Sequence, residues 1–166
     1  KPRVDMEVLE KYHEGIIALS ACLAGEVATH LRKNDYEGAR KAAVKYRNIF
    51  GENNYFLEMQ DHGIPDQATV NAGVMRLSKE LGIPMVVTND SHYIYAEDWE
   101  AHDVLLCIQT NRKVQDENRM RYDGGQYYLK SKEEMAELFP YALEALENTH
   151  KIAERCNVKI IFGEQK

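Results

Sequence analysis

The stretch Asn54–Asp90, NYFLEMQDHGIPDQATVNAGVMRLSKELGIPMVVTND, decides the fold class of this chain. Residues 54–60 are rich in aromatic and branched apolar side chains, as is typical of a β-strand. Residues 65–82 carry a proline near their start, a glycine at their end and apolar residues at helical spacing. Residues 83–90 begin with a second apolar run. A strand, a helix and a strand in this order favour a parallel α/β sheet or barrel.

The same alternation extends toward the N-terminus. Residues 15–22, GIIALSAC, are a further strand candidate, and residues 1–15 read as a polar lead-in to it. A short helix over 25–34 and an amphipathic helix over 34–51 follow. The chain therefore has three strand–helix units, fewer than the eight of a closed barrel. This number favours a piece of a larger fold over a small open sheet.

The last third of the chain is predicted to be mostly helical. Residues 96–109 form a helix, and 110–130 form a loop that ends in a short strand. A Ser-x-x-Glu capping box opens the helix over 131–139. Residues 158–164 close as a strand or an extended linker. The long helix between them has four residues at helical spacing: Leu143, Leu146, His150 and Ala153.

Chemistry-bearing side chains stand where the three predicted strands end. These ends carry Cys22, Glu58 and the pair Asp90 and His92. Functional groups in α/β folds gather at the carboxyl ends of the strands. A thiolate, an imidazole and carboxylates together suit zinc best, with iron or manganese as alternatives. The competing interpretations are a buried cysteine, a solvated glutamate and a hydrogen-bonded Asp–His pair that closes a turn.

The charge pattern offers one further candidate contact. Four basic residues gather in the late loop, and they would either touch a phosphate backbone or form a solvated loop balanced by nearby acids: Arg112, Lys113, Arg119 and Arg121. The net charge of −6 argues against a main nucleic-acid groove in this segment.

The bulk properties are those of a globular protein. The 166 residues suffice for one domain with a proper core, and no apolar run approaches the roughly 20 residues of a membrane-spanning helix. Three cysteines lie far apart in the sequence and cannot all pair, which favours a reducing cytoplasm.

Several stretches together resemble one known family along almost the whole chain. They resemble the alpha subunits of bacterial DNA polymerase III, in the C-terminal half of their PHP (polymerase and histidinol phosphatase) domain and the segment that leads toward the polymerase palm. The stretches that carry this resemblance are EGIIALSACLAGEV, YFLEMQDHGIPDQ, LSKELGIPMVVTNDSHY, EDWEAHDVLLCIQT, YYLKSKEEMAELF and ALENTHKIAERCNV.

The resemblance implies a partial PHP-type distorted barrel in residues 1–110 and a helical extension toward the palm in 111–166. PHP domains hold two or three metal ions at the carboxyl edge of their strands. The later ligands of that site match Cys22, Asp90 and His92. Glu58 matches no ligand position and is expected only to support the ligands. Family members that keep the whole site use it for metal-dependent 3′–5′ proofreading.

The resemblance also implies what this chain lacks. The family's early ligands, among them a His-x-His pair, lie upstream, and the palm carboxylates that bind magnesium lie downstream. We therefore expect the fragment alone to have neither polymerase activity nor a complete phosphoesterase site. In the parent protein the expected partners are DNA and other replisome subunits, and the isolated piece is expected to self-associate through exposed strand edges.

Two other functions compete with this interpretation. One is a stand-alone PHP phosphoesterase of the histidinol-phosphatase kind, and the other is a structural module whose metal site is vestigial. The helices after His92 favour a connection onward over a closing barrel.

Overall fold

The computed structural model describes residues 3–163, and residues 1, 2 and 164–166 of the predicted segments lie outside this description. Its elements follow the chain in this order: α1 (Met6–Tyr12), β1 (Ala18–Leu19), α2 (Glu26–Arg32), α3 (Tyr36–Phe50), β2 (Tyr55–Met59), α4 (Pro65–Leu81), β3 (Met85–Val87), the 3-10 helix η1 (Ala96–Asp98), α5 (Trp99–Thr110), α6 (Lys132–Leu138) and α7 (Leu143–Arg155).

The three strands form one parallel sheet in the order β1-β2-β3, which confirms the predicted α/β class. Ala18 is opposite Tyr55, and Leu57 is opposite Met85. All five residues of β2 are buried, as expected for the central strand of a parallel sheet that is covered on both faces.

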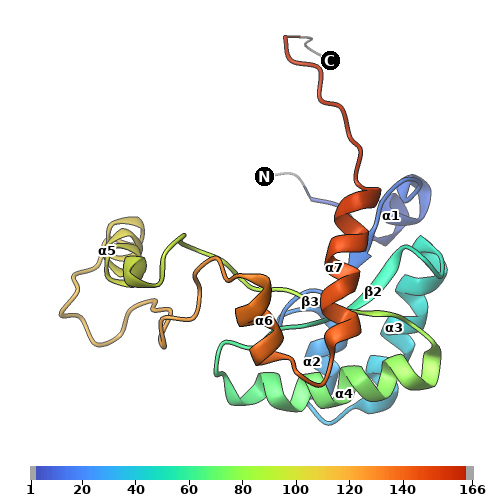
Figure 1. Ribbon diagram of the computed structural model, residues 1–166, viewed down its shortest axis with the longest axis horizontal. Helices are drawn as coiled ribbons and strands as arrows, with labels where there is room; N and C mark the ends of the chain where they lie inside the picture. Colours follow the sequence, from blue (N-terminus) through green and yellow to red (C-terminus); the bar gives the residue numbers. More distant parts are fainter. Residues whose placement is uncertain (1–2, 164–166) are drawn as a thin grey trace.

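Helix α4 forms as its sequence predicts. Pro65 occupies the first turn, where its missing N–H costs no hydrogen bond. Gly82 ends the helix with φ of +66°, in the left-handed region that glycine adopts without strain. Val74 and Leu77 are fully buried on the face that packs against the sheet and α2. Helices α2, α3 and α4 pack on one another and on the strands and enclose the apolar core (Figure 1).

Helix α7 covers the edge of the sheet at β3, with which it is in close contact (Figure 1). The Asn148 side chain donates to the carbonyl of Met85 at 2.8 Å, and the Thr149 hydroxyl donates to the carbonyl of Val87 at 2.9 Å. Side chains of α7 thus satisfy edge carbonyls that another strand would otherwise bind.

The residues noted at helical spacing in the last helix are not those that it buries. Its buried side chains are Ala145 and Asn148, whereas Leu143, His150 and Ala153 are exposed. Leu146 is half-buried against the core. The leucine spacing missed the true face because the helix meets β3 through polar hydrogen bonds.

Two further predictions about local structure were wrong, and the first strand, although present, is shorter than predicted. The N-terminal lead-in contains α1, a short helix with no buried side chain. The first strand pairs only over Ala18–Leu19, because the chain turns sharply at Ala21. The late loop ends in a single bridge between Tyr93 and Tyr128, not in a strand.

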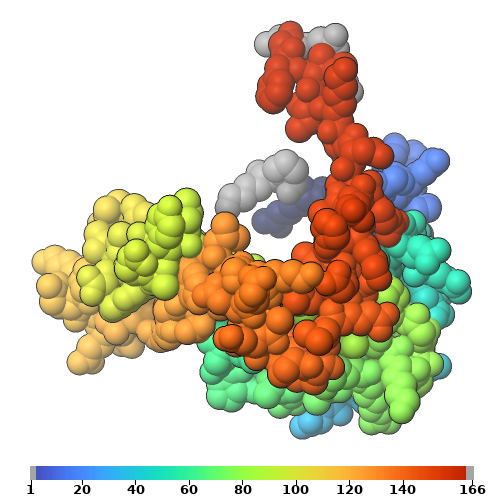
Figure 2. All heavy atoms as spheres, in the orientation of Figure 1, coloured from blue at the N-terminus to red at the C-terminus, as the bar shows by residue number. Residues whose placement is uncertain are grey.

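Helix α5 and the loop after it form a lobe at one side of the molecule, clearly separated from the sheet and its helices (Figure 1). Figure 2 shows the same lobe projecting from the body, and the extended chain after α7 running away from it. Among the helices of residues 3–163, none has the length and apolar character needed to cross a membrane.

Candidate metal site at the carboxyl edge of the sheet

Cys22 lies in the tight turn that follows β1, as predicted for a strand-end residue. Gly25 donates its N–H to the carbonyl of Cys22 at 2.8 Å and closes this turn. The preceding residue, Ala21, has φ of +65°, which is unfavourable for a side chain with a Cβ atom. The Ala21 N–H donates to the Glu58 carboxylate at 3.0 Å, and this bond holds the strained turn in place. The Cys22 thiol is free and its residue is exposed.

Glu58 is a buried carboxylate, 9% exposed, at the centre of this edge of the sheet. Besides the Ala21 N–H, it accepts hydrogen bonds from the Thr88 hydroxyl and from Gln60 at 3.3 Å. Its own N–H donates to the Ser20 hydroxyl at 2.8 Å. Glu58 therefore ties the end of β1 to the end of β3, and it is not the solvated rim residue of the alternative interpretation.

Asp90 and His92 come together after β3. The Asp90 Oδ1 and His92 Nε2 atoms are 3.2 Å apart, and the two side chains are 47% and 30% exposed. The His92 N–H donates to the carbonyl of Tyr127 at 2.7 Å, which anchors this loop to the segment before α6. The pair thus has the closeness that the i, i+2 spacing predicts, in an accessible position.

His62 also belongs to this edge, although the sequence analysis gave it no role. It is 4% exposed, and its Nε2 accepts the Asp90 N–H at 3.2 Å. Its ring stacks on Tyr127 with centroids 4.6 Å apart, and Gln67 contacts its other nitrogen at 2.9 Å. Burial lowers the pKa of His62, so the imidazole is held neutral. Its position directly after β2 was the available signal, because the strand-end rule that selected Asp90 applies equally to residue 62.

Aromatic rings continue from the pair toward α5. The Tyr122 ring lies 4.3 Å from the His92 ring and the His102 ring lies 5.3 Å from it, measured between centroids. Burial lowers the pKa of His102, and the neighbouring His92 lowers it further. Neither contact was foreseen, since both partners come from segments distant in sequence.

The structure assembles part of the predicted ligand set. Asp90 and His92 converge, but across residues 3–163 no three His, Cys, Asp or Glu side chains lie close enough to bind one metal ion. The turn that carries Cys22 is held by Glu58, which also accepts the Thr88 hydroxyl after β3. Carboxylate, imidazole and thiolate suit zinc, manganese or iron, so the donor types fit a metal. The observed pair alone supplies two ligands.

The four basic residues of the late loop differ in their surroundings. Arg119 is 3% exposed and binds Asp103 through two N–O contacts of 2.5 Å, which hold the pKa of that carboxyl below its usual range. Arg121 donates to the carbonyls of Val114 and Asp116 and is exposed. The remaining two are exposed: Arg112 and Lys113. The Arg119 guanidinium is thus bound in an internal ion pair with Asp103.

The sequence of this chain is similar to known proteins over most of its length. Residues 1–62 match the PHP domain family. Nearly the whole chain is similar to a region of DNA polymerase III alpha subunits. It is 48% identical to "DNA polymerase III subunit alpha" of Treponema pallidum over 160 residues, which are 96% of this chain. It is 45% identical to the subunit of Borreliella burgdorferi over 163 residues, or 98% of this chain.

The similarity covers a limited part of these relatives. The chain spans 14% of the length of each of these two proteins. A third relative, from Saccharopolyspora erythraea, is 47% identical over 156 residues, which are 93% of this chain and 13% of that protein. In each case the similarity extends far beyond residue 62, so it includes the helical segments after the candidate site.

Proposed function

We propose that this chain is a segment of a DNA-directed DNA polymerase, a nucleotidyltransferase of DNA replication, in which it forms part of a metal-binding PHP scaffold. The similarity to named DNA polymerase III alpha subunits over nearly the whole chain supports the polymerase assignment. The convergence of Asp90 and His92 at 3.2 Å is the one structural observation that carries the metal assignment.

In this proposal Cys22, Asp90 and His92 hold the metal, with zinc first and manganese or iron as alternatives. Glu58 orients the Cys22 turn by binding the Ala21 N–H, and it reaches β3 through Thr88. A bound divalent metal lowers the pKa of a coordinated water and so supplies a nucleophile toward phosphodiesters. That chemistry would serve 3′–5′ proofreading in the complete protein.

The rest of the proposal concerns the complete protein. Magnesium for nucleotide addition would bind at a polymerase site outside this chain. The partners would be DNA and other replisome subunits, in the cytoplasm, where free cysteines such as the three here persist. The 166-residue chain alone would be inactive, since it offers two converged ligands and no polymerase carboxylates, and it would self-associate through surfaces that the complete protein covers.

The test uses the complete polypeptide that contains this chain, with Asp90→Asn and His92→Ala variants. We expect these variants to bind zinc or manganese about 10-fold or more weakly, to lose degradation of a 3′-mismatched primer and to keep primer extension. Asp66→Asn is the matched control, because Asp66 is an exposed carboxylate that pairs with Arg32 away from the site. Unchanged metal binding in the Asp90 and His92 variants would refute the proposal.

A second candidate function, a purely structural module, is favoured by one observation. The part of the chain that the structure describes does not gather three metal ligands. In that case the complete protein would bind no metal at this edge, and Glu58→Ala would impair folding without any change in nuclease activity.

A further inference from the structure

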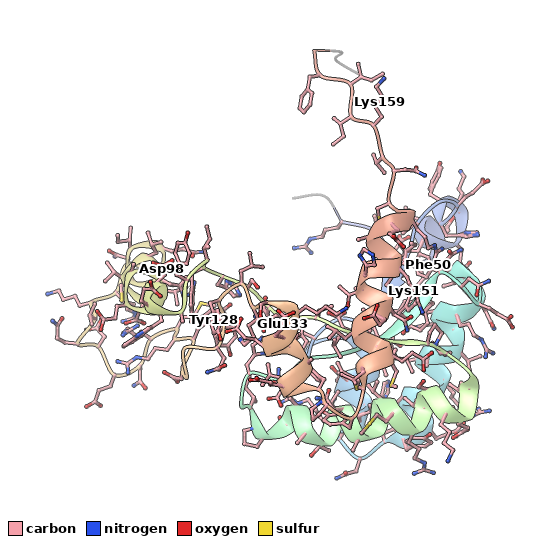
Figure 3. The ribbon with its side chains drawn as sticks, viewed as in Figure 1. Phe50, Asp98, Tyr128, Glu133, Lys151 and Lys159 are labelled. Carbon is pink, nitrogen blue, oxygen red and sulfur yellow. The ribbon has the colours of Figure 1, made fainter. Side chains whose placement is uncertain are left out.

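A small cavity lies beside the candidate metal pair, between the start of α5 and the loop over residues 119–124. Its volume is about 110 Å³, and its aromatic walls are Trp99, His102 and Tyr122. Pockets for drug-sized ligands measure about 300–1,000 Å³, so this cavity admits one ring system and excludes a base pair. Figure 3 labels Asp98, which directly precedes Trp99, on the lobe that carries the cavity.

The cavity shares its wall with the candidate site. Tyr122 and His102 line the cavity, and the same two rings lie 4.3 Å and 5.3 Å from the His92 ring. A ring bound in the cavity would therefore be separated from the Asp90–His92 pair by a single layer of side chains. Trp99 is 48% exposed, so its indole remains accessible to a stacking partner.

The cavity is lined by two arginines, Arg119 and Arg121, and by two aspartates, Asp103 and Asp123. Arg121 lines the cavity, and its hydrogen bonds within residues 3–163 go only to main-chain carbonyls, those of Val114 and Asp116. Its positive charge is therefore not cancelled by a direct carboxylate contact, in contrast to that of Arg119. Asp123 also lines the cavity and offers an acceptor for a ring N–H.

We propose that this cavity binds one unpaired base at the end of a single strand of DNA, an inference that rests on the proposed function. The base stacks on the Tyr122 and Trp99 rings, and the phosphate attached to its nucleotide meets Arg121. The net charge of −6 gives no general attraction for DNA, so stacking supplies most of the affinity. Binding should then depend weakly on salt, as expected for about one phosphate contact.

Trp99 is the only tryptophan in the chain and lines the cavity, so its fluorescence reports directly on binding there. The 166-residue chain is titrated with a short oligodeoxythymidylate in the presence of a chelator, and tryptophan fluorescence is recorded. We expect saturable quenching by the oligonucleotide and none by an abasic strand of the same length. Titration with thymidine monophosphate separates a free nucleotide from a strand end, since the strand end should bind more tightly.

Variants assign the binding to the cavity. Tyr122→Ala should weaken binding about 5- to 150-fold, which is the usual range for loss of one base–aromatic stack, and Tyr122→Phe should preserve it. Tyr12→Ala is the matched control, since Tyr12 is an exposed tyrosine on α1 and does not line the cavity. Circular dichroism confirms that each variant is folded.

The outcomes separate this inference from the proposed function. Absence of saturable quenching, equal quenching by the abasic strand, or unchanged affinity in Tyr122→Ala would each overturn it. If the base binds in chelator while the complete protein binds no metal, the cavity assignment stands and the metal assignment falls. If the complete protein binds metal and the base does not bind, the metal assignment stands and the cavity assignment falls.

Discussion

Replacement of Glu58 by alanine tests whether this carboxylate organises the edge of the sheet. The change removes an acceptor for Ala21, Gln60 and Thr88. A hydrogen bond to a charged group contributes about 1.5–3 kcal/mol, and a buried partner left unpaired costs about 1–3 kcal/mol. Ala21 is exposed and Gln60 and Thr88 are half-buried, so water replaces part of the loss. We expect the free energy of unfolding to fall by about 2–4 kcal/mol.

Urea denaturation followed by circular dichroism measures this loss. Glu80→Ala is the matched control, because Glu80 also accepts hydrogen bonds from two side chains, Tyr36 and Arg40, but does so on the exposed surface. The control should lose much less stability, and Glu58→Gln should lose less than Glu58→Ala because the amide keeps one acceptor. Equal losses for Glu58→Ala and Glu80→Ala would refute the reasoning.

The remaining predictions concern three other sites. Asp103→Asn removes the partner of Arg119 and should speed hydrogen exchange in the Arg112–Asp123 loop. In the unmodified chain the Asp103–Arg119 ion pair should contribute fully to the free energy of unfolding above pH about 4. This contribution should be lost as the pH falls through the lowered pKa of Asp103. Burial lowers the pKa of His62, so the unfolded chain takes up a proton at a higher pH than the folded chain. The metal-free chain should therefore lose stability as the pH falls below 6.5 toward the folded pKa. The urea midpoint of His62→Phe should change less with pH over this range. Leu77→Ala should cost about 2–5 kcal/mol in urea denaturation, because Leu77 is completely buried.

The sequence predicted those elements whose signals are local. The Pro65 start and Gly82 end of α4 were both readable, as was the capping box in which the Ser131 hydroxyl accepts the Glu134 N–H and the Glu134 carboxylate accepts the Ser131 N–H. Each of these features requires only residues within one helix and its ends.

Elements with weak apolar signals were misjudged. Helix α1 buries no side chain completely, and only Leu9 packs partly against the core, although Asp5 caps the helix by accepting the Val8 N–H at 3.0 Å. The buried face of α7 depends on Asn148, a polar residue whose partner Met85 lies 63 positions away. Hydrophobic periodicity cannot identify such a face, because the contact that defines it is a hydrogen bond.

The residues of the candidate site likewise divide into those with a local sequence signal and those defined by contacts between distant segments. Asp90 and His92 could be found together because they are two residues apart, and strand-end placement located Cys22 and Glu58. Strand-end placement could have found His62 as a candidate. It could not have predicted the contacts of His62 with Asp90 and Tyr127, because they join three separate segments of the chain. The Arg119–Asp103 pair likewise joins a loop to a helix, which charge counting along the sequence does not show.

Cobalt substitution tests whether Cys22 shares one metal ion with Asp90 and His92. The complete polypeptide that contains this chain is titrated with cobalt(II), and the thiolate-to-cobalt charge-transfer absorption is recorded. We expect a band that disappears in Cys22→Ser, weakens in His92→Ala and remains in Cys156→Ser, whose exposed thiol is the matched control. Absence of the band, or a band unchanged in Cys22→Ser, would contradict this shared site.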